Sequence, residues 1–127
     1  MIPIGPGPFI TLTEGEIWAI VAVFAMMLFD VIVGVVCALI RHDFKSSKMR
    51  EGLGHKALLI LMVCLAFFVQ GFALHVADLG FDVPLIVPVC VYITLMEVAS
   101  VLETIKDTNP ELADTPLFKL FEKREEA

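Results

Sequence analysis

The stretch IWAIVAVFAMMLFDVIVGVVCALI, residues 17–40, decides the fold, because it is apolar or small throughout except for one aspartate, Asp30. A helix rises about 1.5 Å per residue, so this stretch would be roughly 36 Å long and would exceed the ~30 Å hydrocarbon core of a bilayer. A charge at such a depth costs about 2.5–3.5 kcal/mol on insertion scales. We therefore predict a transmembrane helix whose intramembrane acid has a specific role.

Two further apolar runs follow, at about 57–76 and 83–104, and they predict an all-α membrane protein with three transmembrane helices. The 127 residues are 58% hydrophobic with a mean hydropathy of +0.87, which is typical of an integral membrane protein. We expect a transmembrane domain at 17–104, an extracytoplasmic apolar arm at 1–16 and a cytoplasmic tail at 105–127. The runs also contain three thiols that we expect to be buried and reduced, those of Cys37, Cys64 and Cys90.

Local signals predict where the helices begin and end. Thr13 and Glu16 form a capping-box pattern that opens the first helix. Asp82 is expected to cap the third helix, and Pro88 is expected to kink it. A short C-terminal amphipathic helix is predicted from about residue 116. Its apolar side holds Leu117, Phe118, Leu120 and Phe121.

Residues 41–56, RHDFKSSKMREGLGHK, are basic and contain two glycines, so we expect a loop here. The arm and segment 77–82 contain no Lys or Arg, and the positive-inside rule therefore places the basic loop and the C-terminus in the cytoplasm and the N-terminus outside. No basic region of a signal peptide precedes the first span, which we expect to be retained. The basic residues of the loop are Arg41, Lys45, Lys48, Arg50 and Lys56.

The polar and small residues of the first and third spans fall on defined helix faces. Asp30, Gly34 and Ala38 are spaced four residues apart and share one side, where small residues permit close approach of another helix. The third span has a polar stripe about 120° wide on its inner half. The stripe contains Thr94, Glu97, Ser100 and Thr104, and Glu103 lies in the same half.

The two intramembrane acids are predicted to lie at similar depth, Asp30 about 2 Å and Glu97 about 5 Å past the middle of their spans. We expect no Lys or Arg at that depth, so the acids should be protonated, hydrogen-bonded to Gln, Ser or Thr, or exposed to water. Two interpretations stay open: neutral acids that join helices, and acids that face an aqueous lumen. Since a lumen about 30 Å wide needs on the order of ten helices, a large pore requires a homo-oligomer.

Composition and motifs argue against several function classes. The net charge of −6 argues against binding of nucleic acid through a basic surface. The histidines His42, His55 and His75 have no metal-ligand spacing with the cysteines, and no nucleophile elbow or glycine-rich phosphate loop is found. We therefore expect no enzyme, metal or cofactor, and we expect the lipid bilayer and further copies of the chain as partners.

Three further patterns follow one another along roughly residues 28–112. They are Asp30-xxx-Gly34-xxx-Ala38, Ser46-Ser47 through Arg50-Glu51-Gly52 to Lys56, and Tyr92 through Glu97-xx-Ser100-xx-Glu103. Taken in order, these patterns resemble the small phage-lysis holins, a class that also includes toxin-secretion holins. The resemblance implies a protein of the bacterial cytoplasmic (inner) membrane that oligomerises and opens lesions wide enough to release a cell-wall hydrolase or a toxin, without stable binding of this cargo.

Two other functions stay open at the level of the sequence. In a small oligomeric ion or proton channel, Asp30 and Glu97 would be cation ligands or relay groups. In a non-conducting scaffold or antiholin, the same faces would only bind partner helices. Current without release of protein would indicate the channel, and the absence of any permeability would indicate the scaffold.

Overall fold

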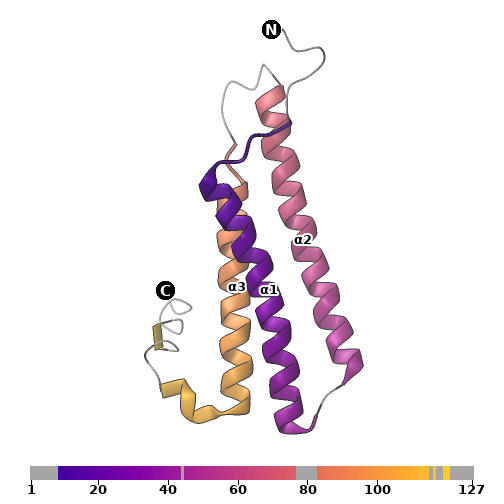
Figure 1. The fold of residues 1–127 in the computed structure, drawn as a ribbon, viewed down its shortest axis with the longest axis vertical. Helices are drawn as coiled ribbons and strands as arrows, with labels where there is room; N and C mark the ends of the chain where they lie inside the picture. Colours follow the sequence, from indigo (N-terminus) through magenta and orange to yellow (C-terminus); the bar gives the residue numbers. More distant parts are fainter. Residues whose placement is uncertain (1–8, 44, 77–82, 115, 117–118, 121–127) are drawn as a thin grey trace.

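A computed structural model describes residues 9–43, 45–76, 83–114, 116 and 119–120. It contains three long helices, α1 (Glu14–Arg41), α2 (Ser46–His75) and α3 (Ile86–Thr108), followed by the short 3-10 helix η1 (Pro110–Asp114) (Figure 1). All three long helices are long and apolar enough to cross a membrane, and no strand occurs in the described ranges. The prediction of an all-α protein with three such helices is confirmed.

The start of α1 is the predicted capping box. The Thr13 side chain accepts a hydrogen bond from the Glu16 backbone N–H at 3.2 Å, and the Glu16 carboxylate accepts one from the Thr13 N–H at 2.9 Å. At the other end, His42 adopts a left-handed conformation, with φ of 58°, and its N–H donates to the last turn of α1. This cap ends the helix and turns the chain toward α2.

The interpretation of residues 41–56 as a loop is wrong, because α2 already begins at Ser46. Gly52 and Gly54 lie inside the helix, where each costs about 1 kcal/mol relative to alanine. The helix tolerates them because its first turns precede the apolar run and continue into a long apolar segment that favours helix. The boundary matters for function, since it makes Lys56 a helical residue with a fixed direction.

The expected start of the third helix is also wrong. α3 begins at Ile86, so Pro88 lies in its first turn, where backbone N–H groups have no acceptor within the helix and a proline interrupts nothing. The predicted cap Asp82 lies outside the described residues. So does most of the predicted C-terminal amphipathic helix, including Leu117, Phe118 and Phe121.

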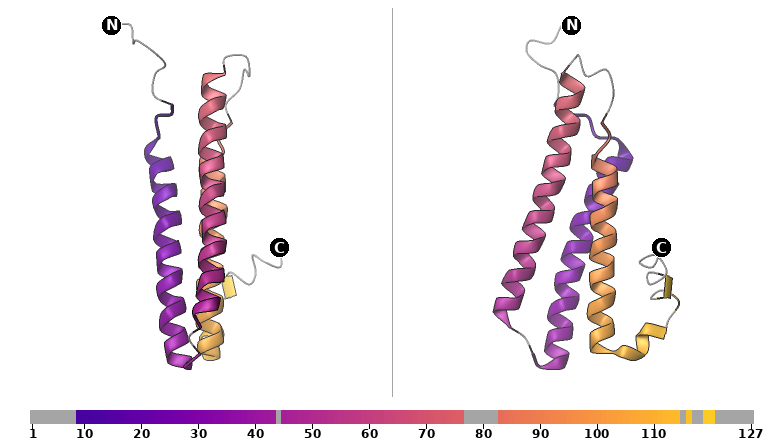
Figure 2. Two further views of the ribbon diagram at one scale, coloured as in Figure 1. Left: turned by 90° about the vertical axis from the view of Figure 1, so that its right-hand side faces the viewer. Right: turned by 180° about the vertical axis from the view of Figure 1, so that it is seen from behind.

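The helix α1 packs along α3, and α2 lies beside them with a smaller contact to α3 (Figure 2). The buried core lies in the half of the bundle away from the α1–α2 connection, and much of the outer surface is apolar and exposed, as in Trp18 and Leu28. Cys37 and Cys90 are buried, but Cys64 is exposed, contrary to expectation. The core consists of Val23, Met27, Leu59, Val63, Ile86, Cys90 and Ile93.

Candidate functional site

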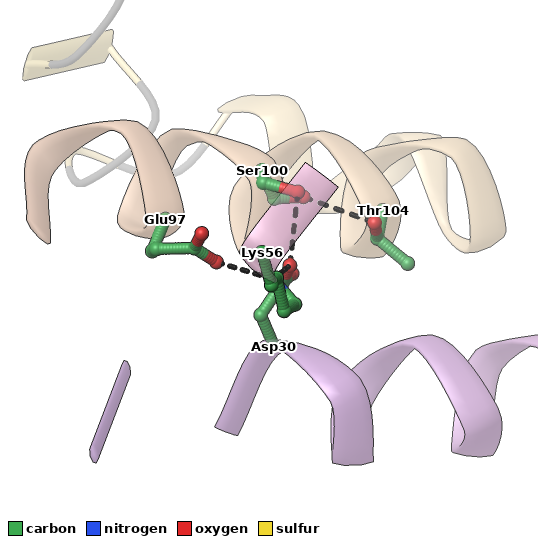
Figure 3. Close-up of polar contacts among 5 residues, drawn as sticks. All are labelled: Asp30, Lys56, Glu97, Ser100 and Thr104. Atoms are coloured by element: carbon green, nitrogen blue, oxygen red, sulfur yellow. Dashed lines mark hydrogen bonds and ion pairs between the residues drawn. The ribbon is translucent and has the colours of Figure 1, made fainter. Parts of the chain in front are cut away.

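One charged side chain from each long helix meets at a single point of the bundle. The Lys56 Nζ lies 2.6 Å from Asp30 Oδ2 and 2.6 Å from Glu97 Oε2 (Figure 3). Asp30 and Glu97 lie about three turns before the ends of α1 and α3, and Lys56 lies about three turns after the start of α2. Because α2 runs antiparallel to the other two helices, this spacing places all three residues at one level, roughly 16 Å from the ends of the helices.

This ion triad, Asp30, Lys56 and Glu97, is largely shielded from solvent. The Glu97 side chain is 3% exposed, and those of Asp30 and Lys56 are 12% exposed. Ser100, one turn after Glu97, donates its hydroxyl to Asp30 Oδ2 at 3.3 Å. Thr104, one turn further, donates to the Ser100 carbonyl at 2.9 Å. The polar stripe predicted on α3 therefore includes Ser100, which holds the α1 acid against α3.

The prediction that no Lys or Arg reaches the two acids is wrong. Lys56 immediately precedes the apolar run of α2, in the segment that the sequence predicts to be a loop, but a lysine at the edge of a span can extend its long side chain along the helix. The reach of a lysine at the edge of a span, in a helix that already begins at Ser46, is the signal that could have predicted the contact of Lys56 with Asp30 and Glu97. With all three groups ionised, the triad carries one uncompensated negative charge in surroundings of low dielectric constant.

An open cleft of about 290 Å³ runs from the triad toward the α1–α2 connection. Gly34 and Ala38 line this cleft, and a Cβ atom built on Gly34 would meet nothing within 4 Å. The space beside Gly34 on the Asp30, Gly34 and Ala38 face is therefore open, and the small residues of this face border the cleft next to Asp30.

The other candidate residues divide into those at the cleft and those away from it. Arg41, Lys45 and Lys48 line the cleft, whereas Arg50 is exposed and does not. Glu103 is also exposed and lies outside both the triad and the cleft lining. No group of three His, Cys, Asp or Glu residues within the described ranges is placed to hold a metal ion.

A second polar contact, which the sequence reasoning did not find, lies at the opposite end of the core. The Gln70 side chain donates to the buried Glu16 carboxylate and accepts a hydrogen bond from the Ile86 N–H at 2.9 Å, so it links the starts of α1 and α3 to α2. The sequence predicts Glu16 only as a capping residue and indicates no role for Gln70. Nothing in the sequence periodicity alone pairs them.

The end of the N-terminal arm is anchored to α2 close to this contact. The Phe9 ring packs against Phe67 and Phe72, at centroid distances of 5.5 and 4.9 Å, and the His75 Nε2 donates to the Phe9 carbonyl at 2.7 Å. Gly71 provides the space for this ring, since a Cβ atom there would lie 2.1 Å from Phe9. The part of the arm that the structure describes therefore lies on α2.

Comparison with known proteins gives one match that covers most of the chain. A family model described as the bacteriophage holin family matches residues 9–115, a range that includes all three long helices and the ion triad. No curated protein and no solved structure matches the chain.

Proposed function

This chain belongs to the bacteriophage holin family, and from that premise we propose that copies of it assemble in the bacterial cytoplasmic membrane and open lesions that release a murein hydrolase or a toxin. The observation that carries the proposal is the ion triad. Charged groups are expensive in a bilayer, and the triad combines two acids with one lysine. Hydration lowers the free energy of such charged groups, so any assembly that exposes the triad to water is favoured.

In the single chain, the triad is shielded where the three helices meet, and Lys56 offsets part of the cost of the acids. Three helices enclose no large lumen, whereas several chains arranged in a ring do. If the helix faces that carry Asp30 and Glu97 turn toward such a lumen, the two acids are hydrated. The free-energy cost of keeping these charged groups in the membrane then falls. Because the hydrated state needs many copies, opening depends steeply on the amount of protein in the membrane.

The proposed orientation places the basic α1–α2 connection and the C-terminus in the cytoplasm and the N-terminus outside. The distribution of Lys and Arg supports it, since the arm and segment 77–82 have none. In this orientation the open cleft faces the cytoplasmic surface of the membrane.

The test is induced expression in bacteria together with a cytoplasmic murein hydrolase that lacks an export signal, with culture turbidity and membrane potential followed over time. We expect abrupt lysis that requires the hydrolase, since only a lesion large enough for a protein releases it. A hydrolase with an inactivated catalytic site is the matched control.

Two other outcomes would replace this proposal. Loss of membrane potential without lysis would favour a narrow ion or proton channel, in which Asp30 and Glu97 serve as cation ligands or relay groups. Unchanged potential and turbidity, with the protein present in the membrane, would favour a non-conducting scaffold or antiholin.

A further inference from the structure

The cleft below the ion triad has the features of a binding site for a phosphate-bearing lipid headgroup. It lies among the three long helices, about 290 Å³ in volume, and opens beside the α1–α2 connection, where the spans end. Arg41, Lys45 and Lys48 line its mouth, while Val35 and Leu53 contribute apolar wall. A basic pocket between transmembrane helices at the level of the lipid headgroups suits an anionic phospholipid.

An unsatisfied donor at the mouth, beside the start of α2, points to an anion. The Arg41 Nε is buried, and within the described part of the chain it has no hydrogen-bond partner, since Asp43 lies 3.5 Å away and makes only a long ion pair. The first turn of α2 lies beside the mouth, where Lys45, Lys48 and Met49 line the cleft, and the N-cap residue Lys45 makes no side-chain capping bond. Uncapped N–H groups at the start of a helix attract phosphate oxygens.

The mouth of the cleft carries one positive charge in excess, because Arg41, Lys45 and Lys48 line it together with Asp43 and Asp107. Asp30 lines the inner end, where the triad carries one negative charge when all three groups are ionised, so the excess positive charge is confined to the mouth. The ion pairs of the described residues include neither Lys45 nor Lys48. Lys56 at the inner end is committed to Asp30 and Glu97.

The geometry points to a site for one anionic phospholipid, whose phosphodiester contacts Arg41, Lys45 and the first turn of α2 and whose glycerol and upper acyl chain lie along the apolar wall. The inference concerns lipid binding alone, so its test does not depend on whether the protein forms pores.

The cleft contains a matched pair of positions for a steric test. A Cβ atom on Gly52 or on Gly54 would meet nothing within 4 Å, both residues are exposed in α2, and only Gly52 lines the cleft. Gly52→Leu therefore fills the cleft, and Gly54→Leu is the control with the same change of helix propensity. The charge test is the double variant Lys45→Gln, Lys48→Gln, which removes two positive charges from the cleft. Its control is the double variant Arg50→Gln, Lys106→Gln, which removes two positive charges from exposed residues outside the cleft.

The experiment uses the full chain purified in detergent micelles and titrated with phosphatidylglycerol, with phosphatidylcholine or with glycerol phosphate, and bound lipid is measured by native mass spectrometry. We expect phosphatidylglycerol to bind more tightly than the other two. The two lysine changes together should weaken its binding roughly tenfold or more, and Gly52→Leu should weaken it also. The two controls should retain it.

If the two double variants weakened phosphatidylglycerol binding equally, the binding would depend on overall charge and the proposed site would be wrong. If Gly52→Leu and Gly54→Leu weakened it equally, the effect would come from the change in the helix, and the proposed site would again be wrong. Binding of glycerol phosphate as tight as that of the lipid would identify a soluble phosphate ligand and overturn the lipid assignment. Equal binding of both lipids would show that the anionic headgroup is not recognised.

Discussion

Lys56 and Glu97 are 41 residues apart in the sequence, yet the Lys56 Nζ lies 2.6 Å from Glu97 Oε2. The same ammonium group lies 2.6 Å from Asp30 Oδ2. One cation on α2 thus joins an acid on α1 to an acid on α3, although α2 has the smaller packing contact with the bundle. At this level of the bundle, a single cation therefore joins α2 to both neighbouring helices.

Lys56→Met should therefore destabilise the single chain by about 3–5 kcal/mol, because it leaves two shielded acids without their cation. The measurement is thermal unfolding of the purified protein in detergent. Arg50→Met, which removes a cation from an exposed position on the same helix, is the control and should change the unfolding midpoint little.

A second step separates charge from packing in the same site. Adding Asp30→Asn and Glu97→Gln to Lys56→Met should restore much of the lost stability, since neutral amides keep the shapes and no charge remains buried. A triple variant as unstable as Lys56→Met alone would mean that the lysine acts through packing, and the electrostatic account of the triad would be wrong.

Asp30→Asn should delay lysis under the proposed function. The change removes the excess negative charge and leaves Lys56 with Glu97 as a balanced pair, so the shielded state is less costly and less free energy favours the hydrated assembly. The measurement is the time of lysis at matched protein levels, with Glu103→Gln as the control because Glu103 is exposed outside the site. Unchanged timing for Asp30→Asn would remove Asp30 from the opening step.

The long apolar runs were sufficient to predict three membrane-length helices, since length and hydropathy alone define such a span. The capping box at Thr13 and Glu16 was predicted because it depends on a short local pattern. The start of α2 was missed because polar residues and glycines beyond the end of a membrane span look the same in a loop and in a solvated helical extension. Lys56 was therefore assigned to the wrong environment.

The site was predicted in part for a related physical reason. Periodicity placed Asp30 near Gly34 and Glu97 near Ser100 on their helices, but it does not state which faces of different helices meet. Glu16 and Gln70 meet across 54 residues, a contact that arises from the packing of whole helices. The small face at Gly34 suggested contact with another helix, whereas within this chain it borders an open cleft.

Gln70→Leu should lower the free energy of unfolding by about 1–3 kcal/mol, because it removes a partner of the buried Glu16 carboxylate and the acceptor of the Ile86 N–H. Thermal unfolding of Gln70→Leu, of Glu16→Leu and of the double variant forms a mutant cycle. The double change should cost less than the two single changes together, since each removes the same hydrogen bond. Strictly additive costs would show that the two side chains do not stabilise each other.

Gly71→Ala should release the end of the N-terminal arm from α2. The added Cβ atom would lie 2.1 Å from the Phe9 ring, so the ring must leave its position between Phe67 and Phe72. The arm should then be cleaved faster after Phe9 by chymotrypsin, with loss of the N-terminal residues followed by mass spectrometry. Gly15→Ala is the control, because its Cβ atom would make an ordinary contact of 3.9 Å with the Thr13 hydroxyl. Equal cleavage rates in the two variants would show that the space at Gly71 does not hold the arm.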